Sequence, residues 1–565
     1  MPRNFTVSDY LALRSFEAMF GPQFDISPSG TKICFSCQRG RADAPFMCSP
    51  FMGSAERGQL FLWSETTDEV VHIPEPEGTG LFSPVWSPDG SRIAACLVDR
   101  AGAYPVIISA ETGELTKLTE RSLGLRPTYK PVEWLNATEI TCDLLEEGQP
   151  PFVLKLETKA SEALIGEWQA AHDGSRATAR LFSAEDTCPE FDFGTPAVLD
   201  IRDGGITSWP EPQARPDPVQ RFVERPSWPC PAPLEPSTTD GVKTRLVVFE
   251  QPERGDRLLV DQGDDGTRIL WERPGHEERV LPFAVNRHLA EITPGPSRFL
   301  TFSTPAHENL PAKLILPPEG TGRPRYPCVV WVYPGVDAGK DMVDTDVLNS
   351  HHAFNTQLLA GAGYAVLRPS ITLPEGSEAG AITQATAVAV TGAVEAAAEA
   401  GLIHLDDLHV AGHSFGGWAA MSLLATTRLF RSGIAMAGCY NLMSSHGQID
   451  ARSRMDPVLR PFSDILEKLW QLPEKPAEHV NHYIAESPLF AAERVEAPVL
   501  LIHGDQDYVA VEQAEEMFSA LRSYGKTASF LRFAGEGHLI SGSPNIQAMY
   551  ETIFDWLKEH RKPEP

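Results

Sequence analysis

The chain has 565 residues, of which 48 are basic and 76 are acidic, so its formal net charge is −28. This acidic balance argues against nucleic acid and anionic membrane surfaces as partners, because both are polyanions. At roughly 100–200 residues per domain, the length predicts two or more folding units.

The N-terminal residues are polar and mixed in character. Met1–Phe20 lacks a basic stretch followed by an apolar one, so no secretory signal is expected. Thr6–Phe20 is predicted to form a short helix, because Leu11, Phe16 and other apolar residues recur there on a helical period.

Cysteine usage suggests a reducing compartment. The chain contains nine cysteines, and an odd number of scattered thiols fits free cysteines in the cytoplasm. Cys34 and Cys37 form a lone CxxC pair without a second pair at zinc-site spacing, so we interpret them as two residues of one β-strand. No metal and no organic cofactor are expected.

Residues 21–285 carry short apolar alternations separated by turn residues, a pattern typical of β-structure. A weak repeat runs through this region. The segment Ile26–Phe35 (ISPSGTKICF) resembles Trp86–Ala95 (WSPDGSRIAA), and degenerate copies begin at Trp134 and His172. Asp89 and Asp173 are 84 residues apart, or two periods of 42. A period in the forties with a turn before each strand favours four-stranded propeller blades.

The length of this region suggests six or seven blades of about forty residues each. A generic β-sandwich with recurrent turns is the alternative. Residues 210–236 hold nine prolines, which exclude regular central strands and indicate a loop or insertion.

From about residue 286 onward, apolar runs alternate with helical periods. This pattern predicts an α/β domain with a mostly parallel sheet covered on both faces. The Ala-rich stretch Ile382–Leu402 is interrupted by two glutamates, so we interpret it as a buried core helix and not as a membrane span.

A glycine-rich motif, Gly412–Gly417 (GHSFGG), follows the apolar strand Leu408–Ala411 and precedes an apolar helix. This strand–turn–helix setting is typical of a nucleophile elbow, with Ser414 as the nucleophile. The backbone N–H of Phe415, at the start of the helix, is expected to donate to an oxyanion.

A serine hydroxyl needs a base that takes its proton, and in this type of sheet the acid and the base follow the serine in that order. His538 follows the last predicted strand and is the candidate base. Asp507 and Asp505 follow the buried strand Val499–Ile502 and compete for the role of the acid. His503, at the end of the same strand, is interpreted as structural.

Four further residues are candidates for contact with the substrate. Tyr333 follows an early strand, where its hydroxyl could be a second oxyanion donor or a packed side chain. Trp418, Tyr440 and Asn441 follow the elbow and the next strand, and each is a candidate pocket residue that could equally belong to the core.

Together these motifs resemble the prolyl oligopeptidase family of serine peptidases. The elbow matches G-x-S-x-G-G, His503–Asp507 matches H-G-x-x-D, and Gly535–His538 matches G-x-G-H. The resemblance favours Asp507 over Asp505, and through the Tyr-x-Gly at Tyr333 it favours the oxyanion role for that tyrosine. It also implies an N-terminal β-propeller at 21–285, an α/β-hydrolase domain at 286–565, and packing of residues 1–20 on that domain.

The sequence departs from the family pattern after Tyr333, where Pro334–Val336 replaces the usual Gly-Gly-Pro. Acylaminoacyl-peptidase, dipeptidyl-peptidase and glutamyl-endopeptidase relatives resemble the chain, and lasso-peptide isopeptidases do so more loosely. The expected function is hydrolysis of short peptides or amides through an acyl-enzyme, with access gated by the propeller. A carboxylesterase, a dedicated isopeptidase or biosynthetic amide hydrolase, and a non-enzymatic propeller scaffold remain alternatives. A homo-oligomer is compatible with the sequence.

Overall fold

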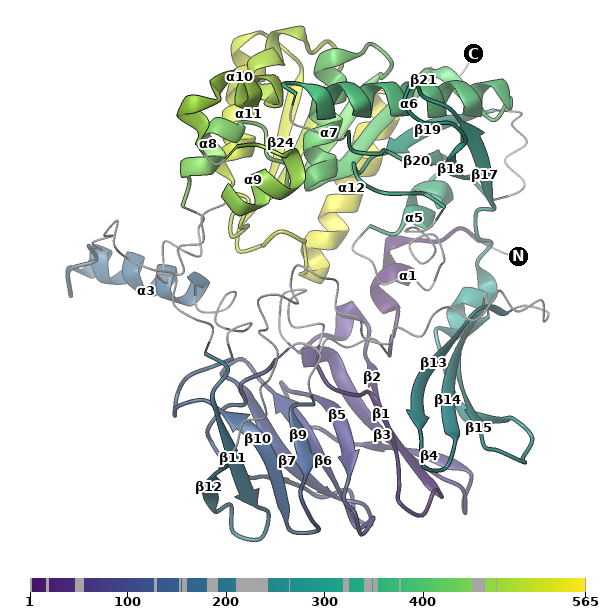
Figure 1. Ribbon diagram of the computed structural model, residues 1–565, viewed down its shortest axis with the longest axis vertical. Helices are drawn as coiled ribbons and strands as arrows, with labels where there is room; N and C mark the ends of the chain where they lie inside the picture. The colour runs from purple at the N-terminus through teal and green to yellow at the C-terminus, as the bar shows by residue number, and fades with distance from the viewer. Residues whose placement is uncertain are drawn as a thin grey trace. The chain divides into compact units, whose positions relative to one another are not determined.

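The computed structural model describes residues 3–16, 20–45, 55–126, 130–151, 154, 160–179, 192–209, 242–263, 265–318, 325–339, 348, 354–374, 378–449, 463–473 and 475–563. The chain divides into two compact units (Figure 1). The α/β unit contains Met1–Tyr10, Ala163–Pro189 and Ile292–Pro565. The β unit contains Leu11–Glu162 and Glu190–Glu291.

An eight-stranded sheet forms the centre of the α/β unit. In spatial order its strands are β17 (Ser297–Phe302), β18 (Leu310–Ile315), β20 (Ala365–Pro369), β19 (Tyr326–Trp331), β21 (Ile403–His413), β22 (Ser432–Met436), β23 (Val499–Gly504) and β24 (Ala528–Phe533). Strand β18 is antiparallel to both of its neighbours, and β20 through β24 are parallel. All eight strands coincide with apolar runs in the sequence. In the sheet, β20 lies on one side of β19 and β21 on the other, so the chain reverses its direction of progress across the sheet at β19. A crevice is expected at the carboxyl ends of β19 and β21, where the connections leave in opposite directions.

Helices cover both faces of this sheet. The helices between β19 and the C-terminus are α5 (Thr356–Gly361), α6 (Ala381–Glu399), α7 (Phe415–Thr426), α8 (Leu442–Gly447), α9 (Ser463–Trp470), α10 (Val480–Ala485), α11 (Glu512–Ser523) and α12 (Ser543–Glu559), with 3-10 turns η6 (Pro476–Glu478) and η7 (Pro488–Arg494). Along β19, Cys328 and Val330 are buried in the core shared with α6 and α7, whereas Val329 and Trp331 face a small cavity lined by α5 and α12. Because side chains alternate along a strand, the two helix pairs lie on opposite faces.

Helix α6 is long and apolar enough, by length and composition alone, to cross a membrane. In the structure it packs against α7 and the strands β17, β20 and β21. Its residues Ile382, Val390 and Val394 are buried there, so α6 is the core helix that the sequence predicts.

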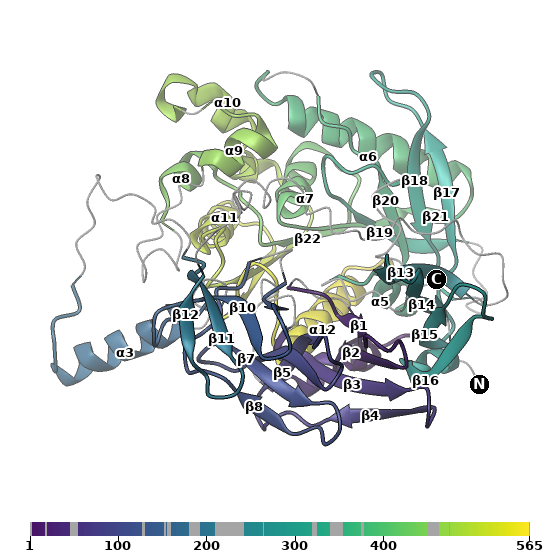
Figure 2. The ribbon, with the colours of Figure 1, turned by 60° about the horizontal axis from the view of Figure 1, so that its bottom comes forward.

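The β unit contains four antiparallel four-stranded sheets. Their strands are β1 (Phe24–Ile26), β2 (Lys32–Gln38), β3 (Gly58–Ser64), β4 (Glu69–Ile73); β5 (Gly80–Trp86), β6 (Arg92–Val98), β7 (Ala103–Ser109), β8 (Leu115–Lys117); β9 (Val132–Trp134), β10 (Glu139–Leu144), β11 (Thr195–Asp200), β12 (Ile206–Ser208); and β13 (Val242–Gln251), β14 (Asp256–Gly263), β15 (Gly266–Glu272), β16 (Arg279–Val285). Apolar cores join β1–β4 to β13–β16, β1–β4 to β5–β8, and β5–β8 to β9–β12. Figure 2 shows the backbone of these sheets.

The predicted number of six or seven blades is not confirmed. Among the described residues of the β unit there are four such sheets, and no apolar core is described between β9–β12 and β13–β16. The proline-rich segment 210–236, interpreted as a loop, lies outside the described residues.

The first two copies of the repeat form equivalent turns. In the β1–β2 turn, Gly30 N donates to Ser27 O at 2.7 Å, and in the β5–β6 turn Gly90 N donates to Ser87 O at 2.9 Å. The third copy spans β9 and β10. The fourth copy, at His172, differs from the prediction of a turn before a strand. It lies at the end of helix α3 (Ala160–Asp173), and the described residues 174–179 that follow form no strand. Asp-Gly is common to both settings since a glycine with positive φ closes hairpins and helices alike.

The N-terminal helix is shorter than Thr6–Phe20. Helix α1 spans Val7–Ala12, and residues 17–19 lie outside the described residues. Beyond the helix, Arg14 N donates to Asn286 Oδ1 at 2.8 Å and Arg14 O accepts from Asn286 Nδ2 at 2.9 Å. Ser15 then bridges β2. The backbone therefore leaves the helix because its hydrogen bonds are made with the β unit.

The N-terminal residues up to Tyr10 pack against other parts of the α/β unit. Asn4 Nδ2 donates to the carbonyl of Gly361 at 2.7 Å, and the ring of Tyr10 meets that of Tyr550 edge-on, with centroids 6.3 Å apart. These contacts lie at the end of α5 and on α12.

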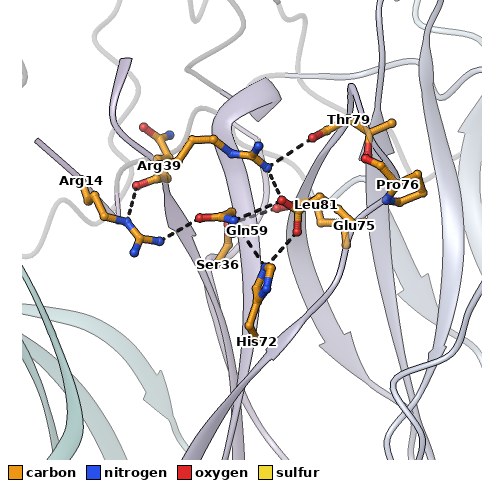
Figure 3. Close-up of polar contacts among 10 residues, drawn as sticks. Arg14, Ser36, Arg39, Gln59, His72, Glu75, Pro76, Thr79 and Leu81 are labelled. Carbon is orange, nitrogen blue, oxygen red and sulfur yellow. Dashed lines mark hydrogen bonds and ion pairs between the residues drawn. The ribbon is translucent and has the colours of Figure 1, made fainter. Parts of the chain in front are cut away.

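A polar network fastens the first sheet of the β unit at one end (Figure 3). Glu75 pairs with Arg39, accepts a hydrogen bond from Gln59 Nε2 at 3.1 Å and lies 2.9 Å from His72 Nε2. Arg14 donates to Gln59 Oε1 at 3.0 Å. The network connects β3 and β4, which carry Gln59 and His72, with Arg14, Arg39 and Glu75 from segments outside the strands.

Cys34 and Cys37 both lie in β2, as expected. Cys34 is buried in the core shared with β5–β8, and Cys37 in the core shared with β13–β16. The two thiols therefore face opposite sides of the sheet and cannot share a metal ion. Within the described ranges no three His, Cys, Asp or Glu side chains are grouped as metal ligands.

Candidate active site

Ser414 occupies a tight turn between β21 and α7. Its φ of 59° and ψ of −122° lie in a region that residues with a side chain rarely adopt. A Cβ at Gly412 would lie 2.2 Å from the carbonyl oxygen of Gly416, and a Cβ at Gly416 would lie 2.2 Å from that of Val332. The backbone around the serine therefore requires both glycines, and the predicted strand–turn–helix setting is present.

Ser414, His538 and Asp507 form a continuous chain of hydrogen bonds. His538 Nε2 lies 2.8 Å from Ser414 Oγ, and His538 Nδ1 lies 2.9 Å from each carboxylate oxygen of Asp507. Because an ionised carboxylate only accepts hydrogen bonds, Nδ1 carries the proton. Nε2 is then free to accept the hydroxyl proton of Ser414. The three residues follow β21, β24 and β23, at the carboxyl ends of parallel strands.

Asp507 is held as an anion although it is fully buried. Burial alone would raise its pKa, but the charge of His538 and hydrogen bonds from His503 and His538 hold the pKa well below its usual range. His503 Nε2 lies 3.2 Å from Asp507 Oδ2, and Val509 N donates to Oδ1 at 2.8 Å. A fixed anion here stabilises the protonated imidazole of His538.

Asp505 has a different set of partners. Its Oδ1 accepts from Gly535 N at 2.8 Å, and its Oδ2 lies 3.4 Å from Arg532. The buried Glu536 accepts from Ser541 N at 2.8 Å. These carboxylates hold the loop that carries His538, and the geometry selects Asp507 as the partner of the imidazole.

Tyr333 and Phe415 flank the serine from two elements. Tyr333 follows β19, and its hydroxyl lies near Ser414. Burial raises the pKa of Tyr333 against the opposing effect of Ser414, so the hydroxyl stays protonated and able to donate near neutral pH. Phe415 is the first residue of α7, where a backbone N–H has no acceptor within the helix.

Two of the candidate pocket residues lie in the core. The side chain of Trp418 is fully buried, stacks on Phe415 with centroids 5.1 Å apart, and donates from Nε1 to the carbonyl of Glu486 at 2.6 Å. Tyr440 is also fully buried, in the same core. In both cases the apolar surroundings of the elbow helix explain the correction, since large aromatic rings fill the space behind the turn.

Asn441 serves as a helix cap. Its Oδ1 accepts from Ser444 N at 3.3 Å at the start of α8, and its Nδ2 donates to Glu516 Oε2 at 2.7 Å. These bonds assign it a structural role in the α8–α11 contact.

Two residues near His538 were not singled out by the sequence analysis. The rings of His413 and Tyr508 contact the imidazole of His538, with centroid distances of 4.6 and 4.3 Å. Each directly adjoins a predicted site residue in the sequence, Ser414 or Asp507, and this adjacency is the signal that could have identified them.

Residues 350–564 match the model of the prolyl oligopeptidase family. The resemblance inferred from the sequence motifs is confirmed. A probable chloroplastic glutamyl endopeptidase of Oryza sativa subsp. japonica is 30% identical over 269 residues, covering 44% of this chain and 26% of the relative. The uncharacterized peptidase YuxL of Bacillus subtilis is 27% identical over 303 residues, covering 51% of this chain and 42% of the relative. The matches thus span less than half the length of these two relatives.

Two solved structures show the fold. The AtxE2 isopeptidase aligns with a TM-score of 0.61 at 14% identity, covering 100% of this chain and 97% of that one. The acylaminoacyl peptidase of Pyrococcus horikoshii aligns with a TM-score of 0.60 at 14% identity, covering 100% and 98%. The fold therefore combines propeller-type sheets with an α/β-hydrolase domain.

Proposed function

We propose that the protein hydrolyses short peptides or amides through an acyl-enzyme formed on Ser414. The observation that carries this proposal is the hydrogen-bonded chain from Ser414 Oγ through His538 to Asp507, on a strained elbow at the carboxyl ends of the parallel strands. The family match supports a peptide or amide as the substrate.

In the proposed reaction, His538 Nε2 takes the proton of Ser414 Oγ as the oxygen attacks the substrate carbonyl. Asp507 fixes the imidazole tautomer and stabilises the imidazolium. The hydroxyl of Tyr333 and the N–H of Phe415 donate to the oxyanion of the tetrahedral intermediate. His538 then passes its proton to the leaving amine, and a water molecule repeats the sequence to release the acyl group.

We further propose that the β unit restricts access, so that short or flexible peptides are preferred. The likeness in fold to an acylaminoacyl peptidase supports this preference. The cytoplasm is the proposed location, and buried free thiols such as Cys34, Cys96 and Cys328 are consistent with it.

A fluorophosphonate probe tests the nucleophile directly. We expect the wild-type chain to be labelled, Ser414→Ala to resist labelling, and Ser523→Ala, at an exposed serine of α11, to be labelled like the wild type. Absence of labelling in the wild type would contradict the proposal and favour a non-enzymatic scaffold.

A substrate panel then separates the hydrolase classes. Turnover of aminoacyl or acyl-aminoacyl anilides and short peptides is expected. Turnover of p-nitrophenyl esters alone would indicate an esterase. Labelling without turnover of any generic peptide would indicate a dedicated isopeptidase or amide hydrolase.

A further inference from the structure

His413, the residue before the nucleophile, makes a direct contact with the base. It is the last residue of β21, and its Nε2 lies 2.6 Å from the backbone carbonyl oxygen of His538. A carbonyl only accepts, so His413 Nε2 carries a proton and donates it. This bond crosses from the strand of the nucleophile to the loop of the base, 125 residues later in the chain.

The ring of His413 also packs against two aromatic rings, those of His538 and Phe354. Its centroid is 4.6 Å from that of His538 and 4.8 Å from that of Phe354. Phe354 in turn contacts Trp331 of β19, with centroids 5.3 Å apart. The imidazole of His413 therefore contacts Phe354, which itself packs on Trp331 of β19, as well as His538.

The other anchors of the His538 loop act at a distance from the imidazole. Asp505 binds the backbone at Gly535, and Glu536 binds the backbone at Ser541 and Gly542. The bond from His413 is made to the backbone of His538 itself. Asp507 binds the Nδ1 side of the ring, and His413 binds the main chain of the same residue.

We infer that His413 is a positioning residue that keeps His538 Nε2 within proton-transfer distance of Ser414. His413 is covalently joined to Ser414 and hydrogen-bonded to the main chain of His538. The end of β21 therefore fixes the positions of both the nucleophile and the base. The inference rests on the proposed function and deepens it. A misplacement of about 1 Å at such a pair is enough to cost about 10²-fold in rate.

Two substitutions separate the hydrogen bond from the ring. His413→Phe keeps the aromatic contacts with His538 and Phe354 but removes the donor. His413→Gln keeps an N–H donor without the aromatic ring. His404→Phe is the matched control, since His404 lies on the same strand near its opposite end.

The rate of fluorophosphonate labelling is the readout, because it reports the nucleophile and base whatever the natural substrate is. We expect His413→Phe to lower kinact by about 10- to 100-fold with little change in KI. His413→Gln should recover most of the loss, and His404→Phe should match the wild type. The low-field proton resonance of the His538–Asp507 hydrogen bond should shift or broaden in His413→Phe alone.

A wild-type kinact in His413→Phe, with an unchanged low-field resonance, would overturn the inference and leave the proposed function intact. If the wild-type chain itself were not labelled, the proposed function would fail and this inference with it. If His413→Phe did not fold, His413→Leu, which also lacks a donor, would take its place in the comparison with His413→Gln. An equal kinact in these two variants would contradict a role for the donated hydrogen bond.

Discussion

Buried polar side chains converge on one point in the α/β unit, whereas in the β unit they are distributed along the boundaries between sheets. Around the elbow, Asp507 and Glu536 satisfy their oxygens with donors from loops at a single sheet edge. In the β unit, Asp25 of β1 accepts from Trp86 N of β5 at 2.7 Å, and Asp256 lies 3.2 Å from Arg254, which itself donates to the β1–β2 turn. The polar groups around the elbow fix the relative positions of Ser414 and His538, whereas those in the β unit connect neighbouring sheets.

From this difference between the two units we expect opposite effects of removing buried polar groups. Removing a buried polar group near the elbow should change the rate of reaction more than the free energy of unfolding. Removing one in the β unit should do the reverse. Four substitutions, from the largest expected effect to the smallest, test that contrast.

Ser414→Ala is expected to lower kcat by on the order of 10⁶-fold, because it removes the attacking oxygen. The urea midpoint should stay within experimental error or rise, since the hydroxyl contributes no core contact. Steady-state turnover of an activated anilide, followed with urea titration of the same sample, measures both. Turnover near that of the wild type would refute the assignment of the nucleophile.

Asp507→Asn is expected to lower kcat by roughly 10⁴-fold, because an amide cannot hold His538 with its proton on Nδ1 in the same way. Asp505→Asn is the matched control and should cost far less, since Asp505 binds the loop and not the imidazole. Comparing kcat for the two variants checks the choice between them. Equal losses would mean that the separation of the two carboxylates in the structure has no functional counterpart.

Tyr333→Phe is expected to lower kcat by about 10²- to 10³-fold with little change in KM, because it removes one donor to the oxyanion. The ring and its packing against Phe415 are retained. Measuring kcat and KM separately tests this. A rise in KM with unchanged kcat would indicate that the hydroxyl binds the substrate in its ground state.

In the β unit, Glu56 controls a pH-dependent stability. It is buried, and burial raises its pKa from the usual 4.5 to about 7 against the opposing charge of Arg57. A carboxyl with a raised folded-state pKa stabilises the fold fully below pH 4.5, and this contribution is lost as the pH rises through 7. The loss amounts to at most about 3 kcal/mol.

Glu56→Gln should therefore flatten the dependence of the urea midpoint on pH between 5 and 8, while fluorophosphonate labelling proceeds as in the wild type. Glu77→Gln, at an exposed glutamate of the same unit, should leave the wild-type dependence in place. An unchanged slope in Glu56→Gln would show that Glu56 is ionised in the folded chain.

The sequence predicts the α/β unit closely because each strand there is a continuous apolar run and the chemistry sits in short motifs. Ser414, His538 and Asp507 are brought together as the order of strands implies. The pocket prediction for Trp418 and Tyr440 differs from the structure because a position after the elbow does not reveal which face of α7 or of the loop is turned into the core. His413 was missed because its partner is a backbone carbonyl, so its place beside Ser414 is the one sign of its role in the sequence.

The β unit is predicted less well. The equivalent turns at Gly30 and Gly90 are recognised because positive φ favours glycine. The Asp-Gly dipeptide of the second turn also occurs at Asp173–Gly174, where it closes a helix. Blade number depends on how many sheets pack together, a property of long-range contacts that turn motifs do not encode. Helix α1 is overestimated because the hydrogen bonds of Arg14 to Asn286 compete with the helical pattern.

The backbone of Ser414 has one further consequence. A non-glycine residue at φ 59° and ψ −122° stores strain of about 1–3 kcal/mol. The turn that exposes the Ser414 hydroxyl therefore lowers the free energy of unfolding. Glycine at this position would relieve the strain and abolish the nucleophile together. Ser414→Gly, in place of the usual alanine exchange, is therefore the variant best suited to trapping an uncleaved substrate in a sturdier protein.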